Sequence, residues 1–125
     1  MTNNTTIEYE LTYLAHELPP EIRSSLPTRM VDFYVGGDHP VLRLRRKGDK
    51  YEITKKTIIN GTDSSAQTEQ TIPLTPTEFE SLASGQTRMV EKDRYAVTID
   101  GHPAEVDVFS GKLEGLVLID FEFEH

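Results

Sequence analysis

Residues 41–56 read VLRLRRKGDKYEITKK and carry the clearest structural signal in the chain, because two alternating runs flank a turn signal at Gly48-Asp49. Successive side chains of a β-strand point to opposite faces, so Arg43 and Arg45 share one face of the first run. In the second run, Lys56 adds a further cation to one face. Glycine and aspartate tolerate the positive φ that tight hairpin turns require. The stretch therefore predicts an antiparallel hairpin with basic side chains on one face.

The same alternation recurs along most of the chain and predicts about eight antiparallel strands. The expected strands are Ile7 to Leu14, Met30 to Val35, Val41 to Lys47, Lys50 to Ile59, Gln67 to Ile72, Arg88 to Ile99, Pro103 to Phe109 and Leu116 to Glu124. Turn signals at Gly36-Gly37-Asp38, Asn60-Gly61 and Asp100-Gly101 favour hairpins, and residues 60–66 read as an exposed loop. The predicted fold class is mainly β (α+β) and connected largely as a meander, with enough antiparallel strands to close into an eight-stranded barrel. A barrel of about eight strands has room inside for side chains or one small ligand.

One helix is clearly marked after the fifth expected strand. Thr75 is suited to the N-cap, Pro76 to the first helical position, and Glu78 completes a capping box. Gly85 is expected to end this helix. A second, short helix is expected between Pro20 and Leu26, because Pro19-Pro20 and Pro27 bound that segment.

Composition narrows the class of protein and of partner. A chain of 125 residues fits a single domain, 1–125, and 36% apolar residues predict a folded core. The net charge of −8 argues against duplex DNA or an anionic membrane surface as the partner of the whole molecule. The chain has no cysteine, which excludes disulfides and thiolate chemistry. Neither a signal peptide nor a membrane span is evident, so we expect a cytoplasmic protein.

The polar faces of the expected strands carry charges in pairs of one sign. Like charges two residues apart on a strand lie about 7 Å apart and repel each other, which favours a ligand of opposite sign between them. Arginine and lysine suit phosphates, and grouped carboxylates suit a hard divalent cation. A polyphosphate carrying Mg²⁺ or Mn²⁺ would satisfy both sets. The alternative is an ordinary sheet whose charged face is solvated. The pairs are Glu8 with Glu10, Arg43 with Arg45, Lys92 with Arg94, Glu105 with Asp107, and Asp120 with Glu122.

Histidines and aromatic residues carry weaker signals. The histidines have no metal-ligand spacing, and we expect them at the surface. The aromatic side chains are expected to pack on the outside of the barrel wall. The histidines are His16, His39, His102 and His125, and the aromatic residues are Tyr9, Tyr13, Phe33, Tyr34, Tyr51, Phe121 and Phe123.

Ordered motifs along nearly the whole chain, from Glu8 to Glu122, resemble the CYTH domain of the triphosphate tunnel metalloenzyme family. EYELT at 8–12 resembles the family's ExExK opening, and VLRLR at 41–45 is similar to its LRxR strand. YEITKK at 51–56 resembles the TxK strand, and Glu69 stands where the family has an acid before its helix. KDRY at 92–95 resembles KxRY, and EVDVF at 105–109 with GLVLIDFEF at 115–123 resembles the ExDxF…GLxxxExEF ending.

The resemblance implies an eight-stranded tunnel that binds triphosphate compounds with Mg²⁺ or Mn²⁺. Family activities include inorganic, thiamine and RNA triphosphatases and class IV adenylate cyclase. By resemblance, the phosphate-binding residues are Arg43, Arg45, Lys56, Lys92 and Arg94, the metal ligands are Glu8, Glu10, Asp120 and Glu122, and the catalytic acids are Glu8, Glu10, Glu69 and Asp107.

Three positions depart from the family pattern: Thr12 replaces the lysine of ExExK, Gln67 stands where an acid often precedes Glu69, and Asp120 shortens the usual glutamate. The leading hypothesis is a metal-dependent hydrolase of tripolyphosphate or a small organic triphosphate such as thiamine triphosphate. Class IV adenylate cyclase activity is an alternative. A polyphosphate- or nucleotide-binding module without catalysis is another, because Thr12 cannot reach a phosphate as an ammonium does. A homodimer that covers a sheet edge is a further expectation.

Overall fold

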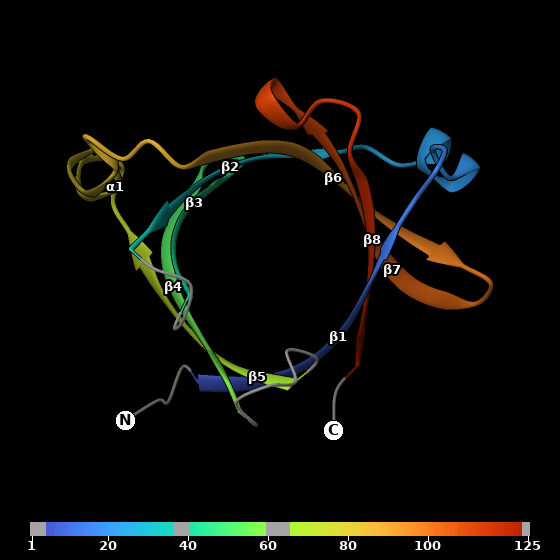
Figure 1. The fold of residues 1–125 in the computed structure, drawn as a ribbon, viewed down its shortest axis with the longest axis horizontal. Helices are drawn as coiled ribbons and strands as arrows, with labels where there is room; N and C mark the ends of the chain where they lie inside the picture. Colours follow the sequence, from blue (N-terminus) through green and yellow to red (C-terminus); the bar gives the residue numbers. More distant parts are fainter. Residues whose placement is uncertain (1–4, 37–40, 60–65, 124–125) are drawn as a thin grey trace.

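The chain forms a closed barrel of eight antiparallel strands, as predicted (Figure 1). The computed structural model describes residues 5–36, 41–59 and 66–123, and of residues 5–10, 41, 66, 122 and 123 it describes the backbone. The strands are β1 (Thr5–Leu14), β2 (Thr28–Val35), β3 (Val41–Lys47), β4 (Lys50–Ile58), β5 (Ala66–Leu74), β6 (Met89–Ile99), β7 (His102–Ser110) and β8 (Val117–Phe123). The expected turns at 37–38 and 60–61 and the expected loop at 60–65 lie outside the described residues, as do His39 and His125.

The barrel is only partly a meander. Its strand order is β1-β5-β4-β3-β2-β6-β7-β8, and β8 pairs with β1 to close it. Strands β2 to β5 form one meander and β6 to β8 another, while β1 lies between β5 and β8 and joins the two meanders. Asp100 and Gly101 have φ values of 49° and 79°, which is the conformation that a tight β6–β7 hairpin requires.

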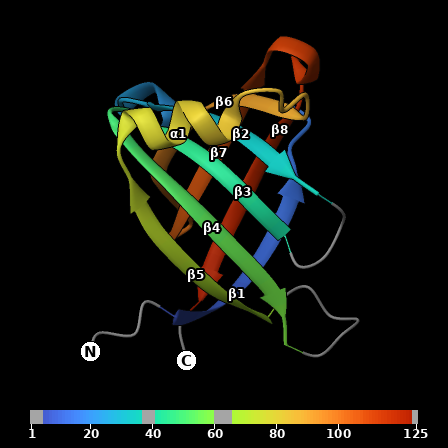
Figure 2. The same cartoon turned by 90° about the vertical axis from the view of Figure 1, so that its left-hand side faces the viewer.

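Helix α1 (Pro76–Ala83) begins and ends where the sequence predicts. Thr75 Oγ1 accepts from the amide of Glu78, and the Glu78 carboxylate accepts from the amide of Thr75, which completes the capping box. Gly85 follows the helix with a φ of 82°. The helix lies on the outside of the barrel, across β3, β4 and β5 (Figure 2). Its Phe79 packs against the rings of Phe33 and Tyr51, at centroid distances of 6.0 and 5.1 Å.

The segment between β1 and β2 forms a 3-10 helix, η1 (Pro20–Ser24), rather than a helix reaching Leu26. Its backbone amides donate hydrogen bonds to carbonyl groups three residues earlier, from Ile22 to Pro19 and from Ser25 to Ile22. The prolines that bound the segment leave too little chain for a longer helix. A second 3-10 helix, η2 (Gly111–Leu113), joins β7 to β8. Among the helices in the described parts of the chain, none has the length and apolar composition that crossing a membrane demands.

Alternation along the strands separates an inner and an outer set of residues. The inner set is largely polar and charged, yet several of its members are buried, among them Arg43, Thr54, Lys92 and Asp107. Direct register pairs connect the inner set around the barrel, for example Arg43 with Thr54 and Arg94 with Asp107. The charged faces therefore line the interior, and the alternative of a solvated charged face is wrong.

Candidate active site inside the barrel

The interior of the barrel is divided into a basic half and an acidic half. Strands β4, β3, β2 and β6 are consecutive in the barrel and supply all five predicted phosphate-binding residues, Arg43, Arg45, Lys56, Lys92 and Arg94. Strands β7, β8, β1 and β5 form the other half, and their sequences contain no lysine or arginine. We refer to these as the basic half and the acidic half. An anion held by the first half would face carboxylates on the second.

Arg43 is the buried cation of the basic half whose Nε has no hydrogen-bond partner among the described residues. It is 7% exposed, and its Nε is the one buried side-chain nitrogen or oxygen in residues 5–36, 41–59 and 66–123 that has no hydrogen-bond partner. Burial and the neighbouring charge of Arg45 lower the pKa of the Arg43 guanidinium, and the charges of Asp32 and Glu69 oppose this shift only in part. A buried cation without a full set of hydrogen bonds lowers the stability of the fold, and a bound anion would offset that cost.

Arg45, the next inward residue on β3, is hydrogen-bonded to the carboxylate of Asp32. Its Nε and Nη2 each donate to a carboxylate oxygen of Asp32 at 2.7 Å, and Asp32 is its direct register partner on β2. The two side chains are buried, with Asp32 0% exposed. Such a two-bond pair fixes the plane of the guanidinium as well as its charge.

Lys92 and Arg94 on β6 share the carboxylate of Asp107 on β7. Arg94 donates through Nε and Nη2 at 2.8 and 2.9 Å, and Lys92 Nζ lies 2.8 Å from Asp107 Oδ2. Burial pushes the pKa of Asp107 up, but the hydrogen bonds and charges of Arg94 and Lys92 hold it below its ordinary value. Burial lowers the pKa of Lys92. Burial also acts to lower the pKa of Arg94, but the hydrogen bonds and charge of Asp107 outweigh it, so the pKa of Arg94 is raised.

Polar contacts between β4 and β5 complete this side of the interior. Lys56 Nζ lies 3.5 Å from Glu69 Oε2. Thr71 Oγ1 donates to Glu69 Oε1 at 3.1 Å and lies 2.9 Å from Thr54 Oγ1. Glu69, predicted as a catalytic acid, is thus held beside a predicted phosphate-binding lysine.

The acidic half brings the predicted metal ligands onto neighbouring strands. The register sets Glu10 opposite Glu122, and Asp120 opposite both Thr12 on β1 and Glu105 on β7. Thr12 Oγ1 donates to Asp120 Oδ1 at 2.6 Å. The side chains of Glu8, Glu10 and Glu122 lie outside the described residues. Among the side chains that the structure does describe, no group of three or more His, Cys, Asp or Glu is arranged to hold a metal ion.

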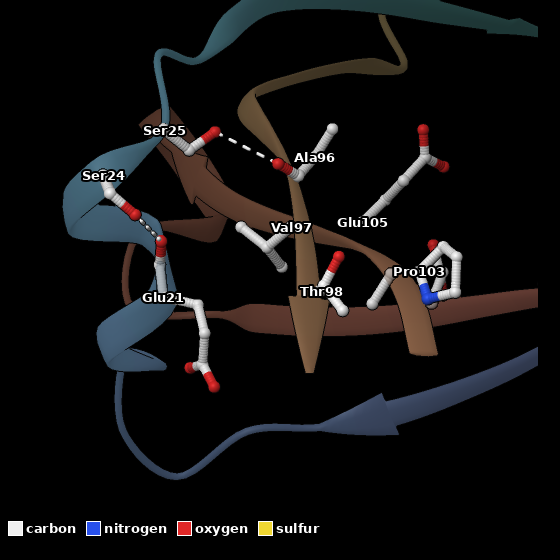
Figure 3. A pocket seen from close by; sticks show the side chains of 10 residues that line it. Glu21, Ser24, Ser25, Ala96, Val97, Thr98, Pro103 and Glu105 are labelled. Atoms are coloured by element: carbon white, nitrogen blue, oxygen red, sulfur yellow. Dashed lines mark hydrogen bonds between the residues drawn. The ribbon is translucent and has the colours of Figure 1, made fainter. Parts of the chain in front are cut away.

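A groove of about 720 Å³ lies where η1 approaches the β6–β7 hairpin (Figure 3). Ser25 Oγ donates to the carbonyl of Ala96 and ties η1 to β6 across one side of it. The groove meets the acidic half of the interior at Glu105 and Asp120. The groove therefore shares two residues with the acidic half of the interior and is not a separate site.

Sequence reasoning missed two interior carboxylates and one interior contact, and it misplaced one aromatic residue. Asp32 and Glu52 are the carboxylates of the basic half, and Asp32 was detectable as a lone acid among apolar residues in the second expected strand. Glu105 was recognised as sharing a face with Asp107, but its contact with Arg94 Nη1 at 3.5 Å was not. Tyr34 was placed outside, whereas the register pairs it with Arg43 in the inner set.

The chain is similar to proteins whose names refer to triphosphates. It is 33% identical over 118 residues to the inorganic triphosphatase of Nitrosomonas europaea, covering 93% of this chain and 76% of the relative. The crystal structure of the inorganic triphosphatase NE1496 superposes with a TM-score of 0.66 at 31% identity, over 92% of this chain and 75% of that one. No protein-family model matches the chain.

More distant structures share the fold. The PH1012 protein from Pyrococcus horikoshii OT3 superposes with a TM-score of 0.67 at 18% identity, over 94% of this chain and 79% of that one. A putative adenylyl cyclase from Hippeastrum, described as having a dominant triphosphatase activity, superposes with a TM-score of 0.56 at 11% identity, over 95% and 80% of the two chains. At these identities the likeness concerns the barrel alone.

Proposed function

Since the chain belongs to the CYTH family of triphosphate tunnel metalloenzymes, we propose that it is a metal-dependent hydrolase of triphosphate compounds. Inorganic tripolyphosphate is the substrate we favour, because the similar protein from Nitrosomonas europaea is named an inorganic triphosphatase. The reaction cleaves a phosphoric anhydride bond with water. It requires no nucleophilic Ser or Cys, and the chain has no cysteine.

The observation that carries the proposal is the buried Arg43 guanidinium, whose Nε has no hydrogen-bond partner among the described residues. At a buried position, an arginine binds phosphate oxygens through directed N–H hydrogen bonds, and its electrostatic attraction to the anion is stronger than at a solvated surface. Lys56, Lys92, Arg94 and Arg45 add positive charge on the same half of the barrel. A linear triphosphate laid along this half would therefore meet a cation at several points along its length, with part of their charge already offset by paired carboxylates.

The donor set of the acidic half fits a hard divalent cation. Such ions take oxygen ligands, and carboxylates are the side chains supplied by the strands of this half. We assign the ligand role to Asp120 together with Glu8, Glu10 and Glu122, which the register sets on the adjoining strands β1 and β8. When bound, Mg²⁺ or Mn²⁺ would neutralise phosphate charge and make water a better nucleophile near neutral pH.

The remaining acids have supporting roles in the proposal. Glu69 accepts from Thr71 and lies beside Lys56, so it can orient that lysine toward a phosphate or accept a proton from water. Asp107 holds Lys92 and Arg94 in place through three short contacts. Both acids therefore set the positions of cations that face the substrate.

A binding module without catalysis is the second candidate, and the observation that favours it is the contact between Thr12 and Asp120. Thr12 stands where the family motif has a lysine, so this position supplies a neutral hydroxyl to a proposed metal ligand. The loss of one cation from the acidic half reduces the charge available to a phosphate leaving group. This candidate predicts tripolyphosphate binding with no turnover.

The deciding experiment is phosphate release from tripolyphosphate, thiamine triphosphate and ATP, each with Mg²⁺, with Mn²⁺ and with EDTA. We expect metal-dependent release that is fastest with tripolyphosphate, and cyclic AMP is measured in parallel to test cyclisation. Tripolyphosphate binding by calorimetry without release would establish the binding module. Absence of both binding and release would contradict the proposed function.

A further inference from the structure

Asp32 is an acid in the basic half of the barrel, and nothing in the proposed reaction requires an acid there. It is 0% exposed, lies on β2, and directly faces Arg45 on β3. Its two oxygens accept the Nε and Nη2 hydrogens of Arg45 at 2.7 Å each. A carboxylate buried at this depth lowers the stability of the fold unless it is fully paired, so Asp32 depends on Arg45 as its partner.

The pair changes what Arg45 can offer an anion. With Nε and Nη2 bound to Asp32, the guanidinium is fixed in orientation and its charge is offset, leaving Nη1 as the nitrogen not bound to that carboxylate. Arg43, two residues earlier on the same strand, has an Nε with no hydrogen-bond partner within the described residues. Among the described residues, the interior therefore presents one arginine whose Nε is open to an anion, Arg43, beside one that Asp32 restrains, Arg45.

We propose that Asp32 is a positioning residue that restrains Arg45 and limits the affinity of the barrel for phosphate anions, so that phosphate products can leave. This inference rests on the proposed function. Substrate and products both present phosphate oxygens, so releasing the charge of Arg45 beside Arg43 would hold both more tightly. Release of product is a common limit on turnover, and Asp32 offsets the charge that would slow it.

Binding in EDTA tests the inference without turnover. Asp32→Asn keeps the size of the side chain and removes its charge, and it is expected to tighten tripolyphosphate binding by about tenfold in calorimetry. Asp93→Asn is the matched control, because Asp93 is a half-exposed acid of β6 that contacts Arg29 at 3.6 Å on the outer surface. Its dissociation constant should stay within about twofold of the wild-type value, since solvent screens that charge.

Kinetics provide a second measurement. Asp32→Asn is expected to lower both KM and kcat for tripolyphosphate and to strengthen inhibition by diphosphate, since substrate and product are both bound more tightly. A merely structural role would instead reduce the active fraction, lowering kcat with KM and the diphosphate inhibition constant unchanged. Unchanged or weaker binding by a folded Asp32→Asn protein would overturn the inference.

A double variant keeps the inference testable if Asp32→Asn fails to fold. Arg45→Gln leaves Asp32 as an unpaired anion beside Arg43, whereas Asp32→Asn with Arg45→Gln removes both charges and lets the two amides pair. The double variant is expected to bind tripolyphosphate at least about fivefold more tightly than Arg45→Gln alone. Equal affinities would overturn the role of Asp32. If the wild-type protein itself does not bind tripolyphosphate, the proposed function fails rather than this inference alone.

Discussion

Arg94 and Asp107 face each other directly across β6 and β7, joined by two hydrogen bonds of 2.8 and 2.9 Å. The same arrangement joins Arg45 and Asp32 across β2 and β3, with two bonds of 2.7 Å. In both hairpins an arginine on one strand is oriented by an aspartate on the next. Arg45 and Arg94 are therefore each held in a fixed orientation, which favours recognition of a substrate with fixed geometry.

Replacing Arg43 separates its role in binding from its effect on stability. Arg43→Met is expected to reduce kcat/KM for tripolyphosphate by about 100-fold, since a desolvated charge-assisted contact is lost. The same change should raise the free energy of unfolding by about 1 kcal/mol, because an unpaired buried cation is removed. Phosphate release and urea denaturation measure the two effects. Arg46→Met, on the outer face beside Tyr51, is the control and should leave release unaffected.

Asp107 should contribute to the loss of folding stability at acidic pH. Its pKa in the folded state is below its ordinary value, so its contribution to stability is complete above about pH 4, the ordinary range of an aspartate. That contribution is lost as the pH falls from there through the lower folded pKa. Asp107→Asn should therefore be less stable at pH 7 and show a flatter decline toward pH 3. Urea denaturation midpoints of the wild-type and Asp107→Asn proteins, measured from pH 7 to pH 3, test this prediction. If the midpoints of both proteins fall equally with pH, Asp107 does not have a lowered pKa in the folded state.

Introducing the lysine that the family motif has at Thr12 should raise activity. Thr12→Lys places an ammonium beside Asp120, where it can contact a phosphate oxygen, and we expect kcat/KM for tripolyphosphate to increase by about fivefold or more. Thr12→Val is the control, since it removes the hydroxyl bond to Asp120 without adding charge and should produce no increase. Binding without release in both the wild-type and Thr12→Lys proteins would favour the binding module.

The capping box of α1 should matter for stability and not for the reaction. Thr75→Ala removes the acceptor for the amide of Glu78 and is expected to cost about 1 kcal/mol in the free energy of unfolding. Thr77→Ala, at an exposed position in the same helix, should cost little or nothing. Phosphate release per folded molecule should be the same for both variants. A loss of release with Thr75→Ala alone would show that α1 communicates with the interior.

The strand bounds were predictable from the sequence because alternation and turn residues are local signals. Gly48-Asp49, Asp100-Gly101 and the Thr75 cap all acted as predicted. The 3-10 geometry of η1 was not predicted, since the choice between hydrogen-bond patterns in five residues depends on how the segment meets β6. Strand order was only partly predicted, because pairing of β1 with β5 and β8 is a contact between distant parts of the chain.

The sequence by itself determined which residues share a strand face, and hence that Arg43 accompanies Arg45 and that Lys92 accompanies Arg94, because side chains alternate with a period of two. Only the tertiary structure decided which acid meets which cation. The pairs Asp32 with Arg45 and Asp107 with Arg94 follow from strand register. Register is set by closure of the whole barrel, so it also decided that the Nε of Arg43, unlike those of Arg45 and Arg94, has no hydrogen-bond partner in the described part of the interior.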